Sequence, residues 1–368
     1  MLPNVVRTRG AKERTTMVKG NSGMTVGIDI GDRYSHLCVL DEHGELAERA
    51  RVATTRTAME GWFSRRVRCR VVLEACCHSP WLSRLLDSLG YEVVVANPRQ
   101  LKLIFKSKRK NDPIDSERLA RLGRVDTELL SPIRHRSEDV QRDLHVLKSR
   151  DVLVGTRTRL VSHIRSVVKS LGGRVPLKVR AETFHAKASE HVPAGLVPSV
   201  EPLLRALACI EAEIKELDKQ IHRLCLEPYP ETAILRQVTG VGEIVALTFV
   251  LVIEDPKRFE KSRDVPAYLG LVPRQWQSGA VDRNLHITKA GDRFLRKLLV
   301  QSANYILGPF GPDCDLKRWG QQLAERGGRG ASKRARIGVA RKLSVLLHHL
   351  WATGQVYKPL VQVPAAAA

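Results

Sequence analysis

The sequence predicts an α/β domain followed by a mainly α-helical remainder, and two changes in the hydrophobic pattern indicate this order. Residues 24 to about 133 alternate short β-like runs with helical stretches, which is the pattern of an α/β fold. Residues 137 to 226 instead repeat apolar side chains with a period of seven, as paired long helices do. From about residue 230, helical patterns prevail. We therefore expect three structured regions.

In the first region we expect five strands, over residues 23–29, 35–40, 45–52, 70–73 and 91–95. A tight polar turn joins the first two, and a helix over residues 80–89 precedes the last. Asp29 falls at the end of the first strand and Glu74 directly follows the fourth.

The second region carries a heptad seam on each of two long helices. One seam consists of Val140, Leu147, Val154, Val161 and Val168, and the other runs from Leu203 to Leu224 in steps of four and three. The glycines and prolines between residues 172 and 202 predict an irregular tip. An antiparallel helical hairpin is the expected result. It could serve dimerisation, and an ordinary bundle packed on its own chain explains the pattern equally well.

The third region opens with a glycine-rich turn, Gly240-Val241-Gly242, before an apolar run from Ile244 to Ile253. This pattern is typical of a helix-hairpin-helix, in which backbone N–H groups approach a phosphate at a helix N-terminus. A simple packing corner between helices is the alternative. Farther on, residues 286–293 precede an amphipathic helix, which Thr288 could cap, and a basic helix is expected over residues 333–351.

The charge balance points to a polyanionic partner. The chain has 61 Lys and Arg against 39 Asp and Glu, a formal net charge of +22, and a pI near 10.1. Nucleic acid is the expected partner, because no apolar run approaches the roughly 20 residues that span a bilayer. The seven cysteines show no C-x-x-C spacing, which argues against a zinc site or a disulfide framework and fits a reducing cytoplasm.

Four acids stand out against this positive background: Asp29, Glu74, Asp112 and Asp115. Carboxylate oxygens are the ligands that Mg²⁺ or Mn²⁺ prefers, and bound divalent ions neutralise charge during phosphodiester cleavage. Asp112 and Asp115 are spaced to share one helix face. Taken alone, Asp112 could merely cap its helix, because Pro113 follows it.

We expect further basic residues and the glycine turn to contact nucleic-acid backbone. A cluster just ahead of Asp112 and several residues downstream of the turn are the candidates: Lys102, Lys106, Lys108, Arg109, Lys110, Gly240, Gly242, Arg274, Arg283, Lys289 and Arg293. Ser278 lies among the latter, and from its residue type alone it fits an ordinary loop.

Five motifs together resemble the DEDD transposases of the insertion sequence 110 family. They are Gly27–Gly31, Leu73–Ala75, Asn111–Ser116, Ala267–Pro273 and Ser278–Gly279. The resemblance implies an N-terminal RuvC-like domain of the ribonuclease H type that bears the tetrad Asp29, Glu74, Asp112 and Asp115. It also implies a coiled coil and a C-terminal transposase domain in which Ser278 is the nucleophile.

The resemblance further implies partners: donor and target DNA, a structured non-coding bridge RNA that pairs with both, and a homodimer or homotetramer. A bacterial or archaeal cytoplasm, with association to the nucleoid, is the expected location. The expected division of the chain is a basic arm (1–23), a RuvC-like domain (24–135), a coiled-coil hairpin (136–229), a transposase domain (230–358) and a tail (359–368).

Three alternatives remain open from the sequence: a resolvase, a kinase and a non-catalytic RNA-binding protein. A RuvC-type resolvase would use the four acids with water as the nucleophile and would not need Ser278. A sugar or acetate kinase is suggested by Gly27-Ile28-Asp29-Ile30-Gly31, which also resembles the first phosphate loop of that ATPase superfamily. A second glycine-rich phosphate motif is missing from the sequence, which disfavours the kinase.

Overall fold

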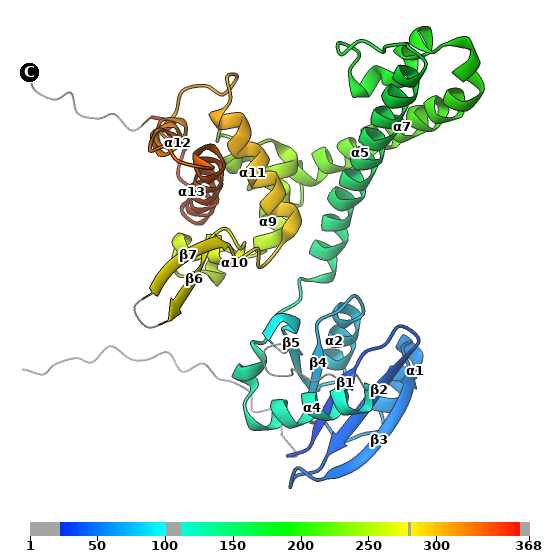
Figure 1. The fold of residues 1–368 in the computed structure, drawn as a ribbon. Helices are drawn as coiled ribbons and strands as arrows, with labels where there is room; N and C mark the ends of the chain where they lie inside the picture. The colour runs from blue at the N-terminus through cyan, green and yellow to red at the C-terminus, as the bar shows by residue number, and fades with distance from the viewer. Residues whose placement is uncertain (1–22, 101–111, 279–280, 361–368) are drawn as a thin grey trace, which may run out of the picture. The chain divides into compact units, whose positions relative to one another are not determined.

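The computed structural model describes residues 23–100, 112–278 and 281–360. The chain divides into two compact units at the Arg136–Ser137 bond. The first unit is α/β and the second is mainly helical, as expected (Figure 1). Within the described ranges, no helix is long and apolar enough to cross a membrane.

A five-stranded mixed sheet forms the centre of the first unit. Its strands are β1 (Thr25–Asp29), β2 (Tyr34–Leu40), β3 (Leu46–Ala53), β4 (Arg70–Glu74) and β5 (Glu92–Ala96), in the order β3-β2-β1-β4-β5. The turns after β1 and β2 produce antiparallel pairs, whereas β1, β4 and β5 run parallel to one another. All five expected strands are confirmed.

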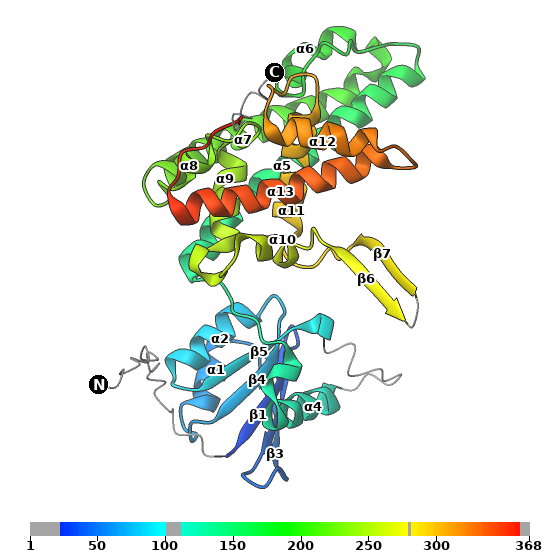
Figure 2. The ribbon, with the colours of Figure 1, turned by 90° about the vertical axis from the view of Figure 1, so that its left-hand side faces the viewer.

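Helices cover both faces of this sheet (Figure 2). Helices α1 (Arg56–Phe63) and α2 (Ser79–Ser88) lie on one face, where Phe63 and Leu82 pack with the alternate strand residues Val71 and Leu73. Helix α4 (Asp112–Val125) lies on the other face, where Leu119 packs with residues such as Val72 and Val94. Both faces are buried, so the central strands are continuously apolar.

Two long antiparallel helices open the second unit, α5 (Glu138–Ser170) and α7 (Val197–Leu226). Their direction follows from their contacts, because Arg150 pairs with Asp218 near one end and Arg157 with Glu211 farther along. Short helical turns, including α6 (Phe184–Lys187), close the far end around a small apolar core. The expected antiparallel hairpin is therefore present.

The tip of the hairpin is shorter than the sequence predicts. Helix α7 begins at Val197 and includes Pro202, which was expected to lie in the irregular segment. Pro198 fits the first turn, where its missing N–H has no intrahelical partner. Pro202 removes one backbone hydrogen bond, but continuing the helix buries Leu204 and Leu207 against α5 and the tip. Tertiary packing outweighs the local cost.

The remaining elements include the apolar helix α9, which packs with α8 and α11. They are α8 (Thr232–Leu235), α9 (Glu243–Ile253), α10 (Val265–Tyr268), the ribbon of β6 (Pro273–Ser278) and β7 (Val281–Ile287), α11 (Arg293–Leu307), α12 (Asp315–Glu325) and α13 (Ala331–Thr353). Every residue of α9 from Ala246 to Ile253 is buried. The near ends of α5 and α7 pack on the same core through Leu147 and Ile221.

Candidate active site and nucleic-acid contacts

Asp29 and Glu74 lie at the same edge of the sheet. Strands β1 and β4 are parallel neighbours with Ile28 opposite Leu73, so the two acids that follow are also adjacent. Neighbouring strands are about 4.8 Å apart, so the backbones of the two acids lie side by side. Both acids are only partly buried and so remain reachable from solvent.

Helix α4 brings Asp115 close to β1. Gly27 faces this helix, and a Cβ built on it would lie 2.6 Å from the amide nitrogen of Ala120 and closer still to the carbonyl oxygen of Ser116. Only glycine permits this approach. The Asp115 carboxylate lies 3.3 Å from Nη1 of Arg118, and its side chain is 36% exposed.

Ion pairs hold α4 in register against the sheet. Glu117 accepts a hydrogen bond of 2.6 Å from Arg49 on β3 and one of 2.9 Å from Arg121. The hydrogen bond from Arg49 is the main reason that the pKa of Glu117 is lowered, so this carboxylate is ionised at neutral pH. Arg124 donates to the carbonyl oxygens of Gly23 and Asp41. The helix that carries two of the expected acids is therefore anchored along its length.

The four acids are only partly placed by the structure. Asp112 is the first residue of α4, and its side chain lies outside the described part of the chain. Among the described residues, no three His, Cys, Asp or Glu side chains are arranged to hold a metal ion. Carboxylate oxygens are hard ligands of the type that divalent cations prefer, and Asp29, Glu74 and Asp115 come from two strands and one helix of the first unit.

A histidine at this edge was not anticipated from the sequence. His78 lies in the loop after Glu74, and its Nε2 is 3.5 Å from the carboxylate of Asp32, in the turn after Asp29. The indole N–H of Trp81 donates to Nδ1 of His78 over 3.2 Å, which leaves the proton of a neutral ring on Nε2. The contact joins the two loops above the acids, and no sequence spacing indicates it.

Ser278 ends β6 on an isolated two-stranded ribbon. It pairs with Val281, the first residue of β7. Its side chain and that of Arg283 lie outside the described residues, whereas Arg274 is exposed near the base of the ribbon. The expected cluster of Lys102, Lys106, Lys108, Arg109 and Lys110 also lies outside the described residues.

The segment between the ribbon and α11 differs from expectation at one residue. Asp292, not Thr288, caps α11, and its carboxylate accepts from the amide of Leu295 over 2.9 Å. The cause is a turn over residues 288–291, in which Lys289 adopts a left-handed φ of 54°. Lys289 and Arg293 are both exposed there.

The glycine turn expected from the sequence is present between α8 and α9. Gly240 has a φ of +81°, and a Cβ there would lie 3.2 to 3.3 Å from atoms of α11. Gly242 is the N-cap of α9 and provides no side-chain cap. The turn therefore packs against α11 while it presents the start of a buried helix.

Comparisons with known proteins agree with this arrangement. A family model for DEDD transposases of IS110 matches residues 26–172, which include the sheet, α4 and α5. A second model, described as the transposase IS116/IS110/IS902 family, matches residues 232–312, which include the glycine turn, the ribbon and α11.

Three similar bacterial proteins have related names. A "probable family 20 transposase" of Pseudomonas aeruginosa is 27% identical over 91% of this chain and 98% of its own length. The transposase for insertion sequence element IS1111A of Coxiella burnetii is 29% identical over 90% of this chain and 91% of its own. The transposase for insertion sequence element IS1328 of Yersinia enterocolitica is 27% identical over 77% and 83%. The chain belongs to the IS110 family of insertion-sequence transposases.

Proposed function

We propose that this transposase cleaves and rejoins DNA through two groups of residues, a carboxylate set in the first unit and Ser278 in the second. The observation that supports it most directly is the adjacency of Asp29 and Glu74 at one sheet edge, with α4 packed beside β1 through Gly27. Asp112 and Asp115 complete the set on α4. On this proposal the first unit is a RuvC-like domain.

The carboxylates would hold Mg²⁺ or Mn²⁺, which would supply charge neutralisation at the scissile phosphate. The Ser278 hydroxyl attacks phosphorus and loses its proton, and the bond from phosphorus to one deoxyribose oxygen breaks. That oxygen leaves as a hydroxyl after taking up a proton. A hydroxyl of another strand then attacks the phosphoserine, which restores Ser278 and joins the new DNA ends.

Replacement of Asp29 tests the carboxylate set. We expect Asp29→Asn to abolish cleavage while DNA affinity stays near that of the wild type, since one carboxylate is lost and the backbone contacts remain. Asp87→Asn is the matched control, because Asp87 is exposed on α2 within the same unit. Undiminished cleavage by Asp29→Asn would contradict the proposed set.

Replacement of Ser278 separates the recombinase from a resolvase that uses water. We expect Ser278→Ala to lose both the covalent protein–DNA adduct and strand exchange, and the control Ser332→Ala, at an exposed position of α13, to keep both. If Ser278→Ala still cuts branched DNA without forming an adduct, the resolvase mechanism is the better description.

The helical hairpin and the partners form the second half of the proposal. The antiparallel α5 and α7 would act as a coiled coil that joins two or four copies, so that acids of one chain work with the serine of another. Mixing Asp29→Asn with Ser278→Ala tests this, because shared sites restore activity and sites within one chain do not.

The remaining boundaries complete the proposal: an arm over residues 1–23, the RuvC-like domain over 24–135, the hairpin over 136–229, the transposase domain over 230–358 and a tail over 359–368. A structured bridge RNA would select donor and target DNA. Sequencing of RNA that copurifies with the protein tests this part. An RNA from the element's flanks with loops complementary to the DNA ends supports it, and unrelated cellular RNA contradicts it.

A further inference from the structure

The turn that joins α12 to α13 (Figure 2) carries an excess of positive charge. Residues 326–342 contain no Asp or Glu. Five exposed cations of this stretch form what we call the basic corner: Arg326, Arg329, Lys333, Arg336 and Arg341. Within the described ranges, no ion pair involves any of them. The basic corner is therefore a positive surface without counter-charges of its own.

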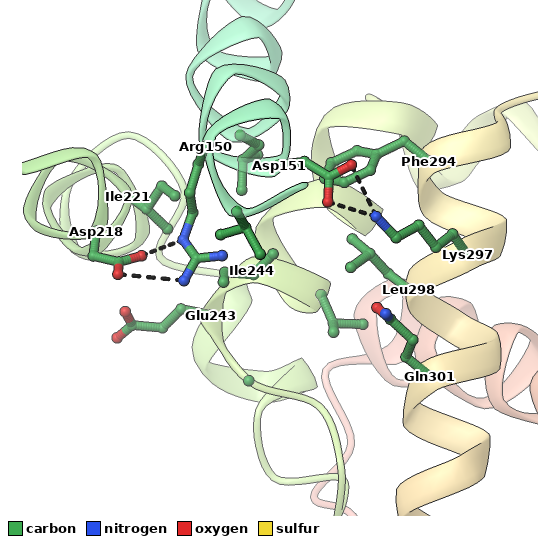
Figure 3. Close-up of a pocket in the computed structure, with 14 residues that line it drawn as sticks. Arg150, Asp151, Asp218, Ile221, Glu243, Ile244, Phe294, Lys297, Leu298 and Gln301 are labelled. Atoms are coloured by element: carbon green, nitrogen blue, oxygen red, sulfur yellow. Dashed lines mark hydrogen bonds and ion pairs between the residues drawn. The ribbon is translucent and has the colours of Figure 1, made fainter. Parts of the chain in front are cut away.

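The cavity among α5, α7, α9 and α11 has the opposite character (Figure 3). Its volume is about 600 Å³. Arg150 pairs there with Asp218, and Lys297 pairs with Asp151. With Glu243 also in the lining, acids outnumber bases. A polyanion is thus repelled by this cavity and attracted by the basic corner.

Tight packing holds the basic corner in shape. A Cβ built on Gly338 of α13 would lie 3.0 Å from the Trp319 ring of α12, so the two helices touch closely. The guanidinium of Arg334 donates to the carbonyl oxygens of Gly327 and Arg329 over 2.8 and 2.7 Å, which closes the turn. The cations therefore project from a fixed frame, and little backbone order has to form when an anion binds.

The charges of the basic corner oppose folding rather than support it. Lys333 and Arg336 lie three residues apart on α13, and like charges at this spacing destabilise a helix. A bound polyanion would remove that repulsion. Lys333 and Arg341 are about 12 Å apart along the helix axis, a length over which duplex DNA carries about seven phosphate charges. One short stretch of duplex can therefore neutralise the whole corner.

The residue types of the corner favour backbone contact over base reading. Asn, Gln, Glu and Asp read bases beside Arg and Lys, and residues 326–342 contain none of these four. Lys and Arg alone on an exposed surface are typical of phosphate contacts.

We propose that the basic corner binds the phosphate backbone of DNA, independently of sequence. DNA is the polymer chosen because the chain belongs to a family of transposases. The inference rests on the proposed function for DNA as the substrate, but it does not depend on the chemistry of Ser278. None of the five residues is among the contacts expected from the sequence.

The decisive variant of the full-length protein combines Arg329→Gln, Lys333→Gln and Arg336→Gln. All three side chains are exposed, so the fold should be kept, with an unchanged or higher melting temperature. We expect affinity for labelled DNA duplexes of two unrelated sequences to fall about tenfold or more. The plot of log affinity against log salt concentration should become less steep by about three, one for each lost phosphate contact.

The matched control combines Lys257→Gln, Lys261→Gln and Arg263→Gln. These exposed cations belong to the same unit, in a segment, 254–264, that has as many acids as Lys and Arg. They lie near His348, which contacts Ser262 and is about 18 Å along α13 from Arg336. Charges so far from the corner are screened at physiological salt, so this control should bind DNA nearly as the wild type does.

The outcomes separate the basic corner from the proposed function. If the wild type binds both duplexes and the corner variant binds them as tightly as the control does, the inference is wrong and the proposed function stands. A loss on only one duplex contradicts backbone recognition. A loss of affinity for a labelled RNA strand with unchanged DNA affinity also overturns the inference, whereas a parallel loss for both polymers fits it. A wild-type protein that binds neither duplex overturns both proposals.

Discussion

Gly27→Ala should damage the carboxylate edge without altering any acid. In the folded chain, the added Cβ would lie 2.6 Å from the Ala120 nitrogen and closer still to the Ser116 carbonyl oxygen, whereas ordinary contact begins at 3.4 Å. Both obstacles are backbone atoms of α4, so no side chain can rotate away. Helix α4 would have to move off β1 by roughly 1 Å or more, because the interior is close-packed.

The expected size of the effect follows from this displacement. Overpacking of a buried site costs about 1 to 3 kcal/mol, so most of the protein should stay folded. A shift of about 1 Å in catalytic groups can lower a rate by about 100-fold. We therefore expect cleavage to fall far more than stability, because Asp112 and Asp115 move with α4 relative to Asp29.

The assay compares urea unfolding with Mg²⁺-dependent cleavage for Gly27→Ala and for Gly61→Ala. The control lies in α1 of the same unit, where an added Cβ meets nothing within 4 Å. It should raise stability by up to about 1 kcal/mol and keep activity. Wild-type cleavage by a folded Gly27→Ala protein would refute the view that α4 must lie against β1 for the acids to work together.

Three other outcomes are expected. Arg157→Met should destabilise the second unit by about 3 to 5 kcal/mol in chemical denaturation. The reason is that Glu211, whose side chain is 6% exposed, would stay buried without the cation that pairs with it. The double variant Arg157→Met with Glu211→Leu should recover most of the lost stability. Burial lowers the pKa of His135 below its usual 6.5, so near and below that pH the unfolded chain binds more protons than the folded chain. The free energy of unfolding should therefore drop as pH falls below about 6.5. His135→Gln should weaken this pH dependence. A chelator should stop cleavage but leave filter binding of DNA intact, and cleavage that continues in its presence would argue against the metal set.

The α/β unit could be predicted well because its strands are short, apolar and separated by polar turns. The positions of Asp29 and Glu74 at strand ends were visible in the sequence. Their adjacency was not, since it depends on β4 pairing with β1 rather than with an edge strand, a choice made by packing of both sheet faces.

Two features that the sequence did not predict arise because tertiary packing outweighs a local conformational preference. Pro202 reads as a helix breaker, yet burial of neighbouring leucines keeps it within α7. Thr288 reads as a helix cap, yet a left-handed turn at Lys289 moves the helix start to Asp292. The His78–Asp32 contact joins two loops 46 positions apart, and such a meeting has no local signature.

The charged pairs inside the hairpin fix its alignment. Sliding α7 by seven residues in one direction would place Arg157 opposite Leu204, and sliding it in the other would place Glu211 opposite Ile164. Either slip leaves a charge facing a hydrocarbon surface, which costs several kcal/mol. The register of α7 on α5 is therefore fixed, and the hairpin cannot lengthen or shorten by sliding of one helix along the other. Helix α5, with 33 residues at about 1.5 Å each, is about 50 Å long.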